Sequence, residues 1–236
     1  MLNTIVFDLD GTLLPLDMDK FMYAYFNEMG MAFHDIIEPK QLVDNIWKAT
    51  GAMVKNIEHR TNEEIFVEAF SKLIDGDFDI YQKRFDKFYD EGFLKVKDTA
   101  YSLPIIKDIV NTLKEKGYNV VIATNPLFPR KAIIHRINWA GFKADDFSYI
   151  TSYETNHYCK PQIQFYEEVL RDIGKTPMEC MMVGNDVEED MVAGKLGMDT
   201  YLITNNIIES DGSEICCTYK GTYEDFYKFA KALKSV

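Results

Sequence analysis

The chain alternates between short apolar runs and longer segments whose apolar residues recur at helical spacing. The first run, residues 4–7, is apolar and β-branched, which is typical of a strand buried on both faces. Later runs of this kind predict strands at 118–123, 147–151, 180–183 and 200–203. Helical patterns lie between and after them, at 104–116, 129–140, 162–173, 188–196 and 223–233. This alternation predicts an α/β fold with a doubly wound parallel sheet covered by helices on both faces.

Residues 16–97 interrupt the alternation with an all-helical segment that is rich in aromatic residues. We predict four helices here: one capped by Asp17 or Asp19 and stopped by Gly30, one opened by Pro39, one opened by the capping box of Thr61 and Glu64, and one over 81–91 stopped by Gly92. The chain therefore divides into an α/β core, residues 1–15 and 98–236, and a helical insertion, residues 16–97. The aromatic stripe of the insertion is interpreted as its own core.

Charge and cysteine content narrow the classes of function. The chain has 236 residues, with 26 Lys and Arg against 38 Asp and Glu, giving a net charge of −12. Such an acidic chain is not expected to bind nucleic acid or an anionic membrane. No apolar run is long enough to span a membrane. The first residues lack the basic region of a signal peptide, so none is expected. Four cysteines without metal-binding spacing indicate reduced thiols, so we expect a cytoplasmic protein. We also expect a monomer or a homodimer, although no feature of the sequence selects between the two.

Polar residues follow the predicted strands at the positions where open α/β sheets bind ligands. They are Asp8 and Asp10 after the first strand, Thr124 and Asn125 after the second, and Asp186 and Asp190 after the fourth, with Lys160 in the same half of the chain. Four carboxylates at one edge stay ionised together only if cations offset them, and one lysine is not enough. Because all the available ligands are oxygens, the sequence predicts a Mg²⁺ site.

These residues resemble the motifs of the haloacid dehalogenase superfamily, and in particular its phosphatases. Asp8-x-Asp10-Gly11-Thr12 is similar to motif I, Thr124 to motif II and Lys160 to motif III. Gly184-x-Asp186-x-x-x-Asp190 is similar to motif IV, with Asn185 at a position where Asp or Gly is frequent. The motifs occur in the family's order and span most of the chain. The resemblance implies a Rossmann-like core and a phosphoric monoester hydrolase.

The resemblance also implies a role for each motif residue. Asp8 would be the nucleophile that forms an aspartyl-phosphate, and Asp10 the general acid and base. Thr124 and the backbone N–H of Asn125 would bind phosphate oxygens, and Lys160 would offset negative charge. Mg²⁺ would be held by the carboxylates of Asp8 and Asp186 and by the backbone carbonyl of Asp10. Asp190 would act indirectly, on a water molecule of the metal or on Lys160.

In this family, a helical insertion after motif I is a cap that closes over the site. Residues 13–16 and 93–101 would then be its hinges, and the substrate would be a small phosphorylated metabolite. Arg60, in the turn between the second and third helices, is a candidate to pair with an anionic group of that substrate. Two alternatives stay open: a phosphosugar mutase of the same superfamily, and a non-catalytic signalling domain phosphorylated on aspartate. Dehalogenase activity is disfavoured, since Asp10 points to phosphoryl chemistry.

Overall fold

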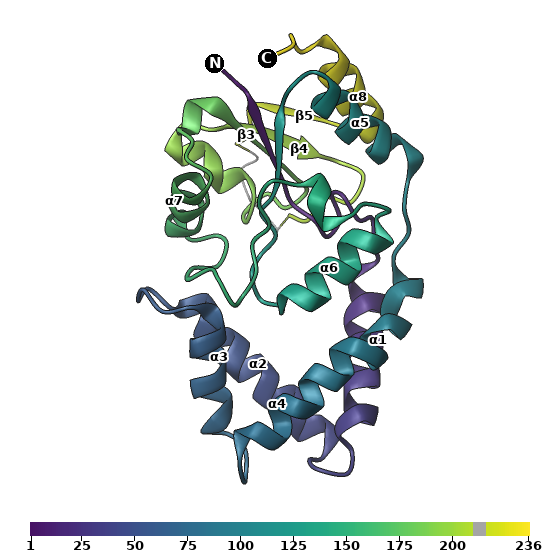
Figure 1. Ribbon diagram of the computed structural model, residues 1–236, viewed down its shortest axis with the longest axis vertical. Helices are drawn as coiled ribbons and strands as arrows, with labels where there is room; N and C mark the ends of the chain where they lie inside the picture. Colours follow the sequence, from purple (N-terminus) through teal and green to yellow (C-terminus); the bar gives the residue numbers. More distant parts are fainter. Residues whose placement is uncertain (210–215) are drawn as a thin grey trace.

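A computed structural model describes residues 1–209 and 216–236 (Figure 1). Its sheet has five parallel strands in the order β2-β1-β3-β4-β5. The strands are β1 (Thr4–Phe7), β2 (Asn119–Ile122), β3 (Cys180–Gly184), β4 (Asp199–Ile203) and β5 (Tyr219–Gly221). β1 lies between β2 and β3 and pairs with both, so the residues that follow these three strands meet at one edge.

Helices cover both faces of the sheet, as predicted. Successive side chains of β1 point to opposite faces, so helices on each face are needed to bury them. Ile5 and Phe7 pack in a cluster with α5 (Pro104–Glu115), α6 (Arg130–Trp139) and α8 (Tyr223–Ala232). Val6 packs on the other face with α7 (Ile163–Asp172) and the 3₁₀ helix η5 (Met191–Leu196). Two shorter 3₁₀ helices are η3 (Ala144–Asp146) and η4 (Pro177–Glu179). The doubly wound α/β fold is therefore confirmed.

The helices of residues 16–97 gather at the end of the molecule away from the two termini (Figure 1). They are α1 (Met18–Phe33), α2 (Pro39–Lys55), α3 (Asn62–Ser71), α4 (Phe78–Lys87), the π-helical η1 (Phe88–Gly92) and the 3₁₀ helix η2 (Phe93–Thr99). Asp17 caps α1, Pro39 opens α2, and Thr61 and Glu64 form the predicted capping box of α3. No helix among the described residues is long and apolar enough to cross a membrane.

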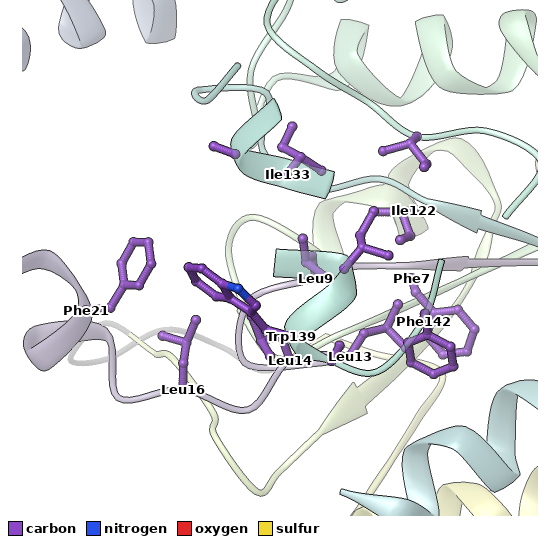
Figure 2. Close-up of a cluster of buried hydrophobic side chains, with 14 of the residues drawn as sticks. Phe7, Leu9, Leu13, Leu14, Leu16, Phe21, Ile122, Ile133, Trp139 and Phe142 are labelled. Atoms are coloured by element: carbon purple, nitrogen blue, oxygen red, sulfur yellow. The ribbon is translucent and has the colours of Figure 1, made fainter. Parts of the chain in front are cut away.

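Two segments join the helices to the sheet, a buried one over residues 13–16 and a more exposed one over residues 99–101. Residues 13–16 and 99–101 run side by side, with a bridge between Leu16 and Ala100 and a hydrogen bond from the Tyr101 N–H to the Pro15 carbonyl. Leu14 is fully buried. Figure 2 shows Leu13, Leu14 and Leu16 in one apolar cluster with Phe21 of α1 and Trp139 of α6. The first of the two connections, residues 13–16, is thus part of the hydrophobic core.

Several predicted elements are wrong in detail. Neither Gly30 nor Gly92 takes the positive φ that ends a helix, so α1 runs on to Phe33 and α4 passes into η1 and η2. Residues 147–151 make a single bridge, Ile150 to Ile122, instead of a strand. The predicted helix over 188–196 is a turn followed by the 3₁₀ helix η5. β5 has only three residues and no apolar run, which is why the sequence pattern missed it.

Candidate active site

A buried lysine links two carboxylates at the carboxyl edge of the sheet. The ammonium nitrogen of Lys160 lies 2.8 Å from Asp8 Oδ1 and 2.6 Å from Asp190 Oδ1. Lys160 and Asp190 are each 1% exposed, and Asp8, directly after β1, is 8% exposed. Buried charges need such partners because their desolvation costs several kcal/mol each. The structure thus brings together one residue from each of motifs I, III and IV.

The loop after β3 is held by its own acidic side chains. Asp186 Oδ1 accepts from the backbone N–H groups of Glu188 and Glu189, both at 2.8 Å, and Asp190 Oδ2 accepts from the Asp186 N–H at 3.0 Å. Such side-chain-to-backbone bonds compete with helical hydrogen bonds, which explains the turn found where a helix was predicted. A Cβ at Gly184 would lie 2.0 Å from Asp190 Oδ2, so only glycine lets this carboxylate approach the strand end.

Asn125 ties the loop after β2 to the loop after β3 and to the backbone at Lys160. Its amide nitrogen donates to Glu189 Oε1 at 3.0 Å, and its amide oxygen accepts from the Lys160 N–H at 3.3 Å. Thr124, directly before it, is buried and lines the same cavity as Asp8 and Asp10. The predicted phosphate-binding pair therefore lies beside the predicted nucleophile.

Asp10 has a partner that the sequence pattern did not reveal. Its Oδ2 forms an ion pair with the Arg136 guanidinium, which comes from α6 and is 1% exposed. Its other oxygen, Oδ1, is buried without a hydrogen-bond partner among the described residues. Gly11 follows with a φ of +86°, which turns the chain sharply past the two aspartates. Asp10 lines the cavity with one oxygen held by Arg136 and the other without a partner among the described residues.

The electrostatics of the edge are dominated by burial and by crowded carboxylates. Burial raises the pKa of Asp8 to about 8, although Lys160 opposes this, and burial also raises the pKa of Asp10 and of Asp186. The pKa of Glu189 is raised to about 7 for the same reason. Burial works against the charge of Lys160, but Asp190 and Asp8 outweigh it and raise the lysine's pKa well above its usual value. The edge therefore favours a further cation.

The donor set at this edge fits a hard cation. All candidate ligands are carboxylate or carbonyl oxygens, the set that Mg²⁺ prefers. Within residues 1–209 and 216–236, no three acidic, histidine or cysteine side chains converge on one point as a ready-made metal site. The ligand set that the sequence predicts uses two carboxylates, Asp8 and Asp186, and one backbone carbonyl, that of Asp10. Mg²⁺ completes such incomplete sets with water.

Arg60 does not reach this cluster. Its guanidinium lies 2.7 Å from Glu68 Oε2 on α3, and it is not among the described residues that line the cavity. Sequence reasoning also missed Glu189 and Arg136, which do lie at the site. Glu189 precedes Asp190 and its position inside motif IV could have singled it out, whereas Arg136 occupies a helix face with no motif around it.

Comparison with known proteins agrees with these motifs. Residues 2–197 match the family described as haloacid dehalogenase-like hydrolase. The chain is 26% identical to the pyrophosphatase PpaX of Anoxybacillus flavithermus over 82% of this chain and 79% of that one. It is 24% identical to the enolase-phosphatase E1 of Aquifex aeolicus over 90% and 94% of the two chains. The crystal structure of a HAD phosphatase from Thermococcus onnurineus has the same fold, with a TM-score of 0.63 at 16% identity, and covers all of both chains. The chain therefore belongs to the haloacid dehalogenase-like hydrolases.

Proposed function

We propose that the protein is a Mg²⁺-dependent phosphatase that hydrolyses a small phosphorylated metabolite through an aspartyl-phosphate on Asp8. The observation that carries the proposal is the Lys160 ammonium bridging Asp8 and Asp190 at the carboxyl edge of β1 and β3. Relatives named as phosphatases, among them a glyceraldehyde 3-phosphate phosphatase of Methanothermobacter thermautotrophicus that is 29% identical over 44% of this chain, support the reaction class.

In the first step, a carboxylate oxygen of Asp8 attacks phosphorus, and the bond from phosphorus to the alcohol oxygen breaks. Asp10 gives a proton to the leaving alcohol, and burial, which raises its pKa, suits it to carry that proton. Thr124 and Asn125 hold phosphate oxygens, while Lys160 offsets their charge. The products of this step are the free alcohol and the aspartyl-phosphate.

In the second step, water attacks the phosphorus of the aspartyl-phosphate. Asp10, now ionised, takes a proton from this water, and the bond between phosphorus and Asp8 breaks. Inorganic phosphate leaves, and Asp8 and Asp10 return to their starting states. Arg136 keeps the Asp10 carboxyl oriented throughout, because its guanidinium holds one of the two oxygens.

Asp8, Asp186 and the backbone carbonyl of Asp10 would hold the Mg²⁺, and Asp190 acts through Lys160. When bound, the cation supplies positive charge beside the phosphate and favours the ionised form of the nucleophile. Supporting this assignment, the structure of the putative hydrolase YfnB of Bacillus subtilis, described as bound to magnesium, has the same fold at a TM-score of 0.58 and 19% identity.

The helical segment, residues 16–97, would serve as the cap over this site, with the α/β core supplying every residue named in the reaction. Its helices line the far side of the cavity that begins at Asp8 and Asp10. Arg60 is left out of the proposed site, because its charge is already paired with Glu68. A cytoplasmic location, and a monomeric or homodimeric state, stay predictions.

The test is phosphate release from a panel of small phosphate esters, with Mg²⁺ and with excess chelator, for wild type and Asp8→Asn. We expect metal-dependent release that falls at least about 10³-fold in the variant. Asp108→Asn is the matched control, since Asp108 is an exposed carboxylate of α5 away from the cavity. Borohydride should convert phosphorylated Asp8 to homoserine, detectable by mass spectrometry.

Equal rates for wild type and Asp8→Asn would contradict the proposal. Isomerisation of a sugar phosphate without net phosphate release would instead establish the mutase alternative. A stable aspartyl-phosphate without turnover would establish the signalling alternative.

A further inference from the structure

A cavity of about 430 Å³ extends from the sheet edge into the helical segment. One end holds Asp8, Asp10 and the other residues of the candidate active site, and the remaining wall comes from α1 to α4, η1 and the loops after β2. This volume is within the range of sites that bury a drug-sized ligand. It is far larger than a phosphate group requires, so most of it is available to the leaving group.

Aromatic side chains dominate the wall away from the sheet edge. Nine of the described residues that line this wall are aromatic, and they outnumber the polar ones. Among the nine are Tyr25, Phe26, Trp47, Phe66, Phe85 and Phe128. Trp47 of α2 is 53% exposed and lies with its ring centroid 5.6 Å from that of Phe26. A large exposed indole beside a cavity is apolar surface that a ligand can cover.

The charged groups on that wall are mostly negative. Glu63, Asp86 and Glu154 line it, and among the described lining residues Lys131 supplies the opposite sign. The Lys131 ammonium is already paired, since it lies 2.8 Å from Asp90 Oδ1. A second negative group on the substrate would therefore meet carboxylates and no unpaired cation on the described wall. The like charges would repel each other.

We infer that the substrate is the phosphate monoester of a bulky aromatic alcohol that carries no negative charge besides the phosphate. This inference rests on the proposed function and specifies its leaving group. The phosphate lies at the sheet edge, and the aromatic group occupies the cavity between the rings of α1, α2 and α4. Phosphorylated carboxylic acids fit this wall poorly, because their carboxylates would lose water and meet Glu63, Asp86 and Glu154.

Three matched esters test the inference, since all are phosphates of simple primary alcohols: ethyl phosphate, 2-phenylethyl phosphate and 2-(4-carboxyphenyl)ethyl phosphate. We expect kcat/KM for 2-phenylethyl phosphate to exceed that for ethyl phosphate by about 30-fold, the scale that burying one apolar group provides. The added carboxylate should remove most of that advantage. Titration with 2-phenylethylphosphonate and ethylphosphonate gives a readout of binding without turnover.

Variants assign the preference to the wall. Trp47→Ala should lower the ratio of phenylethyl to ethyl kcat/KM about fivefold. Tyr23→Ala is its matched control, because Tyr23 is a 78% exposed aromatic residue of α1 that does not line the cavity. Glu63→Gln should raise kcat/KM for the carboxylated ester relative to the phenylethyl ester, since it removes one of the repelling charges.

The outcomes separate the inference from the proposed function. Metal-dependent hydrolysis of all three esters at equal kcat/KM overturns the inference and leaves the phosphatase assignment in place. No hydrolysis, together with tighter binding of the phenylethylphosphonate than of the ethylphosphonate, supports the aromatic site and overturns the reaction. Neither hydrolysis nor preferential binding overturns both.

Discussion

The sheet edge and the helical segment hold their charges in opposite ways. At the edge, Lys160 and Asp190 are 1% exposed and lie 2.6 Å apart, so their charges are sealed from water. In the helical segment, the ion pair of Lys72 and Glu68 has side chains that are 70% and 45% exposed. The interior of the helical segment is instead built from aromatic rings, such as Phe70 packed against Phe66 and Phe85.

This difference separates what each region does. Exposed ion pairs contribute little, whereas buried charges raise the energy of the folded state unless every one is matched. A fold that keeps Asp8, Lys160 and Asp190 together in a buried place gives up stability there, which is typical of a reactive site. The helical segment carries no such cost, and its aromatic residues supply both its stability and the wall of the cavity. Three substitutions and one titration test this division between a charged sheet edge and an aromatic helical segment.

The largest effect is expected for Lys160→Met. The substitution leaves Asp8 and Asp190 buried without their cation, which should lower the free energy of unfolding by about 4 kcal/mol. Urea denaturation in chelator measures it. Lys72→Met is the matched control in the helical segment, where the pair with Glu68 is exposed, and a far smaller loss is expected. Equal losses in the two variants would contradict the division.

The next effect is expected for Phe70→Ala. Phe70 is fully buried among the rings of α3 and α4, and its truncation leaves a cavity that should cost about 3 kcal/mol of unfolding free energy. Phe70→Leu, which keeps most of the volume, should cost less than about 1.5 kcal/mol. Thermal and urea unfolding of both variants measure this. A loss below 1 kcal/mol for Phe70→Ala would show that the aromatic interior is not what stabilises the segment.

The sequence predicted the sheet edge well because its signals are local. A short apolar run bounded by Asp or Gly predicts where a buried strand ends, and parallel strands bring those ends together. Asp8, Thr124 and Asp186 were placed in this way, without knowledge of any contact. Local signals also marked the start of α3, since the hydroxyl of Thr61 and the carboxylate of Glu64 both bond within one turn.

Features set by distant contacts were not predicted. Arg136 lies 126 residues from Asp10, and only the packing of α6 against β1 brings the two together. The apparent stop at Gly30 was misleading for the same reason, because a Cβ there would lie 3.2 Å from Pro39 of the next helix. That glycine allows two helices to approach and does not end one. The cavity wall likewise depends on the packing of four helices, which periodicity does not specify.

A smaller effect is expected for Thr61→Ala. The Thr61 hydroxyl oxygen accepts from the Glu64 N–H at 3.2 Å, and Glu64 accepts in return from the Thr61 N–H at 3.0 Å. Losing this capping box should lower the unfolding free energy by about 1 kcal/mol. Thr61→Ser keeps the hydroxyl and should retain most of the stability. If Ser and Ala variants unfold alike, the capping box contributes nothing to the stability of α3.

The smallest effect concerns the acid titration of Glu68. Hydrogen bonds from Lys72 and from Arg60 lower its pKa to about 2 from the ordinary 4.5. A carboxylate whose pKa is lowered on folding stabilises the protein above pH 4.5, and that stabilisation is lost as the pH falls toward 2. Carbon-detected NMR of the Glu68 carboxyl group measures the pKa directly, and Glu68→Gln should unfold with less dependence on pH in this window. Arg60→Gln should move the Glu68 pKa upward, because it removes one of the two donors. A midpoint near 4.5 in wild type would show that Arg60 is not held by Glu68 and would return it to consideration as a ligand of the substrate.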